Sequence, residues 1–300
     1  ATILQALLSA EGIQSTQALI NAGTIYSLPE IPTVTAVNHV INYLPDFDIF
    51  VDATSATVPF GLIPFSIQDK PILLVDGYEK GARTPASEKL DKQRVTSLIT
   101  IDKQGNATGK VGVALEGLTA AYIRSSFRNS TPDSENEWLK GIFSHDGYPG
   151  FGSLTKEDPM PMMDSFDYQV DFNIQQHIPL YGLAAFKVYP LLPTDMPIYS
   201  LLDAPQEIDQ ADVACSPALS DEKYTYQFPE NIQIIATPED SVIEGASIYY
   251  QAHYKIEGNT LEIHRTLEDK TKGNICSPEF MISQKEVIQK ILWDINSQIV

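Results

Sequence analysis

The feature that most restricts the fold is a pair of alternating apolar and polar runs near the C-terminal end. The runs cover residues 247–256 and 260–267 and flank a turn at 257–259, which is a strong β-hairpin signal. In this register His253 faces His264 across the two strands. Two histidines are fewer ligands than a metal site needs, so we expect a solvated cross-strand pair and no metal.

Strand patterns recur along the rest of the chain. Twenty prolines, seventeen glycines and fourteen tyrosines suit a β-rich fold with many turns. We expect a hairpin over residues 37–54 with its turn at 45–48, a second hairpin from about residue 95 to 117, and a surface loop at 145–152. Further strands are expected at 16–21, 166–174 and 184–189, and again from 223 onward.

Helical patterns stand at both ends of the chain and once between them. Residues 1–10 carry an apolar stripe, and two more helices are expected over 118–128 and 135–143. Near the C-terminus, Ser283 and Glu286 have capping-box spacing, so a helix is expected to start there. Its apolar stripe would comprise Val287, Ile291, Ile295 and Ile299. The fold class is therefore α+β.

The charge balance excludes some partners. The net charge is -19, from 39 acidic and 20 basic residues, and such a surface repels a phosphate backbone or an anionic membrane. We therefore expect no nucleic-acid partner, and the charge is best explained as a contribution to solubility. No apolar run approaches the roughly 18 residues of a membrane span, and no phosphate-loop or dinucleotide fingerprint points to a cofactor.

The two cysteines, Cys215 and Cys276, both lie in turn-like stretches (DVACSP and GNICSP). A disulfide between them would close a loop of about 60 residues and contribute roughly 4 kcal/mol in the chain-entropy model. It would indicate an oxidising compartment such as a periplasm or cell envelope. Two unpaired thiols are the alternative, which sequence alone leaves open.

The hairpin over 37–54 brings a candidate catalytic pair together. With a four-residue turn, His39 and Asp52 become diagonal neighbours on one face of the two strands. A carboxylate against an imidazole fixes its tautomer, as in the base-and-orienter half of a nucleophilic triad. On spacing alone, a satisfied surface pair explains them better.

A wider pattern surrounds this pair. The segments at 19–23 (Leu-Ile-Asn-Ala-Gly), 38–39 (Asn-His) and 52–55 (Asp-Ala-Thr-Ser) follow a helix with a small-residue stop. This arrangement over residues 1–85 resembles a bacterial transglutaminase-like family of the papain-like cysteine enzymes. The remainder of the chain, acidic and β-rich with a C-terminal helix, is similar to the C-terminal portion of that family, though less specifically.

The resemblance implies roles for individual residues. His39 would be the general base, Asp52 its orienter, and Asn38 a weak accessory. The family's nucleophilic cysteine opens the helix that here begins the sequence, so it would lie about four residues before Ala1. Neither Cys215 nor Cys276 follows that pattern, and the chain starts in mid-helix, without an initiator Met or a signal peptide. We therefore expect a fragment cut just after the cysteine; a cysteine on a separate segment and a lost nucleophile are the alternatives.

These observations predict three parts. Residues 1–85 would be the C-terminal half of a transglutaminase-like core, with a helix on an antiparallel sheet. Residues 86–94 would be a linker, and 95–300 a β-rich domain with a C-terminal helix. The intact protein would hydrolyse or transfer an amide of a protein or peptide, and this chain alone would be inactive. The alternative is a non-catalytic interaction or scaffold module of the bacterial envelope.

Overall fold

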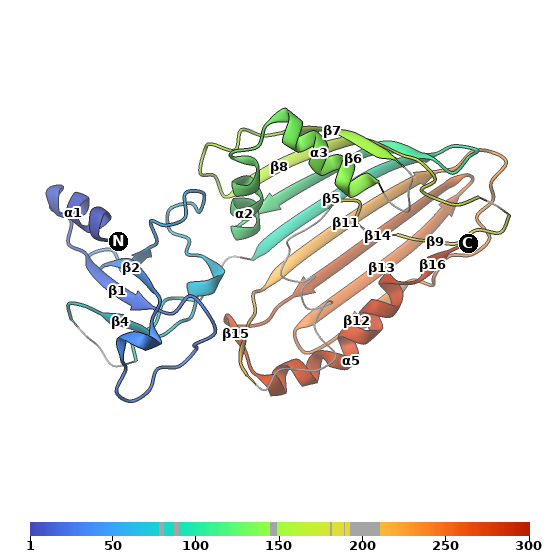
Figure 1. Ribbon diagram of the computed structural model, residues 1–300. Helices are drawn as coiled ribbons and strands as arrows, with labels where there is room; N and C mark the ends of the chain where they lie inside the picture. The colour runs from blue at the N-terminus through green and yellow to red at the C-terminus, as the bar shows by residue number, and fades with distance from the viewer. Residues whose placement is uncertain (78–80, 87–89, 145–148, 181, 189, 193–210) are drawn as a thin grey trace.

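The described part of the chain folds around two main β-sheets, one of four strands and one of eight, with two further short strand pairs (Figure 1). The computed structural model describes residues 1–300 except 78–80, 87–89, 145–148, 181, 189 and 193–210. Helices and antiparallel and mixed sheets are both present, so the α+β class is confirmed. Among the described residues, no helix has the length and apolarity to span a membrane.

The small sheet has the strand order β3-β2-β1-β4, and all its neighbours are antiparallel. Its strands are β1 (Thr16–Ile20), β2 (His39–Leu44), β3 (Ile49–Val51) and β4 (Ile72–Leu74). Two short 3-10 helices, Val34–Ala36 and Phe65–Ile67, stand in its connecting loops. A compact cluster of alanine and isoleucine side chains forms its core: Ala18, Ile20, Ile41, Ile63, Ile67 and Ile72.

The first helix, α1 (Thr2–Ala10), confirms the helix expected at 1–10. It touches the small sheet through polar groups, because Gln5 donates to Ser15 O at 2.9 Å and accepts from Gln17 Nε2 at 3.0 Å. None of its residues is buried, and Ile3 and Leu7 are 79% and 62% exposed. Its apolar stripe is therefore not used within the described part of the chain.

The large sheet has the order β12-β13-β14-β11-β5-β6-β8-β7, and its one parallel pair is β11 with β5. This pair joins two antiparallel halves. The first half holds β5 (Asp91–Ile101), β6 (Ala107–Glu116), β7 (Gly150–Lys156) and β8 (Ser165–Ile174). The second holds β11 (Ala218–Gln227), β12 (Ser241–Glu244), β13 (Ile248–Glu257) and β14 (Thr260–Asp269).

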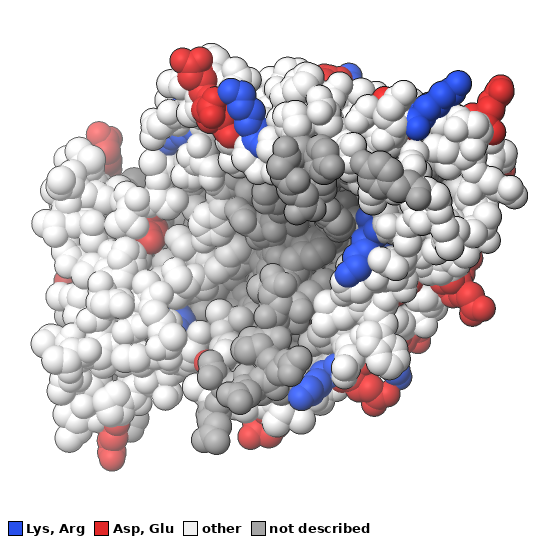
Figure 2. All heavy atoms as spheres, turned by 45° about the vertical axis from the view of Figure 1, so that its right-hand side comes forward, with Lys and Arg blue, Asp and Glu red and all other residues white. Residues whose placement is uncertain are grey.

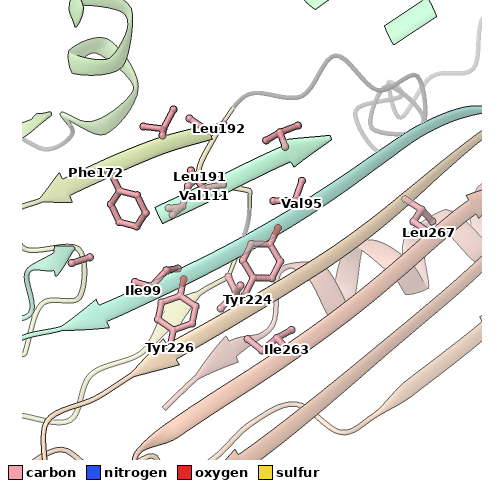
Figure 3. Packing of buried hydrophobic residues seen from close by; sticks show 14 of the residues in the cluster. Val95, Ile99, Val111, Phe172, Leu191, Leu192, Tyr224, Tyr226, Ile263 and Leu267 are labelled. Carbon is pink, nitrogen blue, oxygen red and sulfur yellow. The ribbon is translucent and has the colours of Figure 1, made fainter. Parts of the chain in front are cut away.

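One face of the large sheet is buried. Burial alternates residue by residue along the long strands, as the two-residue period of a strand requires. Figure 3 shows the rings of Tyr224 and Tyr226 from β11 on the same side as Ile99 of β5 and Ile263 of β14. The helices α2 (Leu118–Phe127), α3 (Pro132–Phe143) and α5 (Pro278–Ile295) contribute to the same hydrophobic cluster, so they cover this face.

A buried polar network anchors α5 to the sheet. Asp294 of α5 accepts hydrogen bonds from the hydroxyls of Tyr250 and Tyr254 on β13. Arg265 of β14 donates to Tyr254 Oη at 3.1 Å. On β11, burial raises the pKa of Glu222 to about 6 even though Tyr224 donates to it. No local sequence pattern indicates these connections, because they join α5 with strands far away in the chain.

Two short strand pairs complete the fold. β9 (Phe186–Lys187) pairs with β16 (Gln298–Ile299), and β10 (Val213–Ala214) pairs with β15 (Ile275–Cys276). Beside the second pair, a disulfide bond joins Cys215 and Cys276 with a Cα–Cα distance of 5.9 Å.

The expected start of the C-terminal helix is wrong. α5 begins at Pro278 and is capped by Ser277, whose hydroxyl accepts from Phe280 N at 3.3 Å. A proline with its fixed φ suits the first helical position, so Ser277-Pro278 is a stronger start than Ser283. Ser283 instead lies within the helix and donates to Phe280 O. The expected apolar stripe also ran too far, because Ile299 belongs to β16.

Other element boundaries also differ from the expected ones. β5 begins at Asp91, so the last four residues of the expected 86–94 linker are in a strand, and 87–89 lie outside the described residues. α3 begins at Pro132 rather than 135, because Thr131 and Ser134 form the capping box. β7 begins at Gly150, within the loop expected at 145–152, of which 145–148 are outside the described residues. The strand expected at 184–189 is reduced to Phe186–Lys187.

The disulfide gives a first testable prediction. Replacing both cysteines (Cys215→Ser with Cys276→Ser) should lower the free energy of unfolding by about 4 kcal/mol, because the bond closes a long loop of the unfolded chain. Urea unfolding measures the change. Reducing agent should have the same effect on the parent chain and none on the double variant. Two free thiols in non-reducing mass analysis of protein purified from an oxidising compartment would contradict the bond.

Candidate functional site

The candidate site lies on the β2–β3 hairpin of the small sheet. Leu44 pairs with Ile49 and Asn42 with Val51, so the turn is the expected four-residue turn. His39 is the first residue of β2 and Asp52 follows the end of β3. The hairpin register therefore places both side chains on one face, at the end of the hairpin opposite the turn.

The structure brings His39 and Asp52 into direct contact. His39 Nε2 lies 2.9 Å from Asp52 Oδ2. The carboxylate side chain is 4% exposed and the imidazole 22% exposed. An ionised carboxylate only accepts hydrogen bonds, so Nε2 carries the proton and the neutral ring keeps its lone pair on Nδ1. In this tautomer Nδ1 of the partly exposed ring is a basic nitrogen that makes no hydrogen bond to Asp52.

Thr54 fixes the carboxylate of Asp52 from its other side. Asp52 Oδ1 accepts from the backbone N of Thr54 at 2.9 Å and from its hydroxyl at 2.7 Å. Burial raises the pKa of Asp52, but the hydrogen bonds from Thr54 and His39 outweigh burial, and the pKa falls below its ordinary value of 3.8. Asp52 is therefore an ionised, oriented acceptor at neutral pH.

Asn38 contacts a different part of the chain. Its Oδ1 accepts from Ala22 N at 2.8 Å, and its backbone N donates to Ile20 O at 3.1 Å. Asn21 completes the turn by accepting from Gly23 N and donating to Ala36 O. Asn38 thus ties the segment after β1 to the strand that begins with His39, and the accessory role given to it stays a prediction.

Lys70 holds the segment that follows. Its ammonium group donates to Gly23 O at 2.6 Å and Ile25 O at 3.1 Å and lies 3.5 Å from the ring centroid of Tyr26. Burial, and then the charge of Arg83, lowers the pKa of Lys70 to about 8. The hydroxyl of Tyr26 in turn hydrogen-bonds the backbone of Ala214, next to the disulfide.

The other expected site residues lie apart from this pair. Cys215 and Cys276 are bonded to each other, so neither supplies a thiol to His39. His253 pairs with His264 as predicted, but each contacts its own carboxylate, Asp240 and Asp221 respectively. Among the residues with a described placement, no group of three His, Cys, Asp or Glu side chains is arranged to hold a metal ion.

Helix α2 of the large sheet packs against the loop that follows Asp52. Leu118 and Ala121 of α2 form a buried cluster with Val58. The hydroxyl of Tyr122 accepts from Phe65 N at 3.4 Å, and Arg128 donates to Ala56 O. The candidate pair is thus held by its own hairpin and, through residues 56–65, by the large sheet.

The helix expected at 118–128 is confirmed as α2, but sequence reasoning missed its contact with residues 56–65 and missed Thr54 as a hydrogen-bond donor to Asp52. The Asp-Ala-Thr spacing carried a signal for Thr54, because an Asp side chain often accepts hydrogen bonds from two residues on. The contacts of Tyr122 and Arg128 span 57 and 72 residues of sequence, and no local pattern indicates such pairs.

Comparison with known proteins gives two matches. A family model described as a domain of unknown function with a solved structure (DUF3858) matches residues 216–300. A crystal structure from Parabacteroides distasonis, described as a "putative protease", is similar at 13% sequence identity and a TM-score of 0.45. The match covers 100% of this chain, which spans only 42% of that protein. No curated protein matches the chain.

The hydrogen bonds to Asp52 predict its acid–base behaviour. Thr54→Val removes the hydroxyl donor, so the pKa of Asp52 should rise; carboxyl ¹³C NMR measures it. Thr54→Ser keeps a hydroxyl and should leave the pKa close to that of the parent. A pKa of Asp52 that is unchanged in Thr54→Val would contradict the assigned hydrogen bond.

The same substitution has a pH-dependent effect on stability. Asp52 has a depressed pKa when folded, so its stabilisation is complete above its ordinary pKa and is lost as pH falls through the folded-state value. Thr54→Val should therefore cost about 1.5–3 kcal/mol at neutral pH, and less in acid. Urea unfolding at several pH values measures this; an equal cost at every pH would contradict it.

The contact with α2 predicts a local effect on the small sheet. Ala121→Asp places a carboxylate in the buried cluster with Val58, whereas Ser125→Asp adds the same charge on the exposed side of the helix. Hydrogen exchange at Ile67 should accelerate at least about tenfold in Ala121→Asp only, while exchange at Ile99 in the large sheet changes less. Equal exchange at Ile67 in both variants would show that α2 does not support the loop.

Proposed function

We propose that the chain is part of a cysteine-dependent acyl-transfer enzyme of the transglutaminase-like type. The observation that carries this proposal is the 2.9 Å contact between His39 Nε2 and Asp52 Oδ2, with Thr54 fixing the carboxylate. In this proposal residues 1–85 belong to the catalytic core and residues 95–300 support it. The substrate is an amide of a protein or peptide, which is hydrolysed or transferred to an amine.

Each step of the reaction assigns a task to the pair. His39 Nδ1 takes the proton of a cysteine thiol, and the thiolate sulfur bonds to the amide carbon. The resulting oxyanion collapses, the C–N bond breaks, and Nδ1–H gives its proton to the leaving amine. Water or a second amine then attacks the thioester carbon while His39 Nδ1 accepts its proton; the C–S bond breaks, and the released thiolate takes that proton back from Nδ1–H. Asp52 stays ionised throughout and holds Nε2–H in place.

The nucleophile in this proposal is a cysteine outside residues 1–300. Cys215 and Cys276 form a disulfide with each other and provide no free thiol, so the chain by itself is expected to be inactive. The disulfide also favours an oxidising compartment, and we place the protein in the periplasm or at the cell envelope. The net charge of -19 supports a partner other than nucleic acid, and the face drawn in Figure 2 shows its Lys and Arg side chains scattered rather than gathered in one basic patch.

A second candidate is a non-catalytic interaction or scaffold module of the envelope. The observation that favours it is that both cysteines of the chain are bonded to each other. In that case the His39–Asp52 contact would be structural and would activate no thiol. The two candidates differ in one measurable property, which is whether His39 raises the reactivity of a cysteine.

Thiol labelling distinguishes the two candidates. In the longer polypeptide that carries a cysteine upstream of Ala1, iodoacetamide should label that cysteine at neutral pH much faster than an unactivated thiol. His39→Ala should abolish the acceleration, because the imidazole no longer takes the proton. The control is His264→Ala, which removes a histidine–aspartate contact of the large sheet, the one with Asp221 at 2.5 Å. Equal labelling of the parent and His39→Ala would reject the enzyme and favour the module.

A further inference from the structure

A pocket of about 340 Å³ lies between α2 and α3, away from the His39–Asp52 pair. Its apolar wall consists of Phe127, Trp138 and Tyr168. The ring of Phe127 lies 5.6 Å from Trp138, nearly perpendicular to it, and 5.6 Å from Tyr168. Phe127 and Tyr168 are buried in the core of the large sheet, so this wall is rigid. The volume is at the small end of the roughly 300–1,000 Å³ of small-molecule sites.

The serine and glutamate side chains that line the pocket offer acceptors, whereas Trp138 adds one donor, its indole N–H. Ser126 donates its hydroxyl proton to Tyr122 O, and Ser130 donates within the protein, to Phe127 O and Glu135. The hydrogen bonds to Glu135, from Ser130 and Lys156, both reach Oε1. Within the described part of the chain nothing donates to Oε2. The ligand must therefore bring its own hydrogen-bond donors.

The two charged groups beside the pocket, Glu135 and Lys156, are paired with each other, which disfavours a charged ligand. Burial raises the pKa of Glu135, but the hydrogen bonds from Lys156 and Ser130 prevail and lower it, so the carboxylate is ionised and repels an anion. The Lys156 ammonium group pairs with this carboxylate and lies 5.6 Å from the ring centroid of Phe127. A ligand cation would bind above the face of the Phe127 ring, and the Lys156 ammonium group of the protein already lies there.

We propose that this pocket binds a neutral sugar ring. The ligand must be uncharged and rich in donors and have one apolar face, and a pyranose combines all three properties. Its C–H face packs against the negative faces of the aromatic rings. Its hydroxyls donate to Ser126, Ser130 and the free oxygen of Glu135. This binding site is independent of the chemistry at His39.

Tryptophan fluorescence provides a direct test. The chain has two tryptophans, and Trp293 on α5 is 71% exposed, so in the Trp293→Phe variant the signal comes from Trp138 alone. The probes are methyl β-glucoside, methyl β-galactoside and N-acetylglucosamine, with glucuronate as the anionic arm and choline as the cationic arm. At least one neutral sugar should give a saturable change with a Kd of about 1 mM or below. Glucuronate should bind at least about tenfold more weakly than its neutral counterpart because of Glu135.

Variants place the binding in this pocket. Glu135→Gln and Ser130→Ala should each weaken sugar binding by about tenfold, since each removes an acceptor. Ser125→Ala changes an exposed serine of α2 that does not line the pocket and should have no effect. Circular dichroism confirms that each variant is folded. Three results would overturn the proposal: no saturable change with any neutral sugar, saturation by choline alone, or binding unchanged in both pocket variants.

Discussion

Burial of one face of the large sheet is the constraint on which the rest of the structure depends. Side chains alternate between the two faces along the strands of this sheet. The inward-facing residues form a single hydrophobic cluster, to which six strands contribute buried residues: β5, β6, β8, β11, β13 and β14. The helices α2, α3 and α5 cover this one face because each carries the apolar residues that the cluster needs. The position of α2 follows from this packing, and α2 in turn supports the loop that follows Asp52. The geometry of the candidate pair is therefore linked to a hydrophobic core in which neither residue takes part.

Two kinds of contact hold the candidate site in place, and only one of them could be predicted from the sequence. The contact of His39 with Asp52 follows from turn length and strand period, both of which are local, so it could be predicted. The support from Tyr122 and Arg128 depends on tertiary packing and could not be. The start of α5 was misread for a further reason. Ser277-Pro278 and the Ser283–Glu286 spacing both resemble helix starts, and the Ser277 cap with Pro278 at the first helical position gives the longer helix. Hairpins and strands were predicted well because their signals are short-range.

The region matched by the DUF3858 model corresponds to a defined part of the large sheet. The matched region, residues 216–300, contains β11 to β14 and α5, which form one half of the large sheet. Its first strand, β11, pairs along its whole length with β5, which lies outside the match. The matched region is thus one half of a shared sheet in this chain. Within that half, hydrogen bonds from Tyr250 and Tyr254 to Asp294 fix its helix on the sheet, and Arg265 extends this network to Val188 O outside the match.

The parallel pairing of β5 with β11 is expected to form after the antiparallel pairs of the first half. Partners such as Gln93 and Ser220 are 127 residues apart, so loop closure is costly and this pairing forms late. During synthesis the first half, up to β8, is complete while β5 still presents an unpaired edge of eleven residues. An exposed edge of that length is a template for pairing with another chain. The interval before β11 emerges is therefore the period in which a nascent chain is most prone to aggregate, and a chaperone that covers the β5 edge would act then.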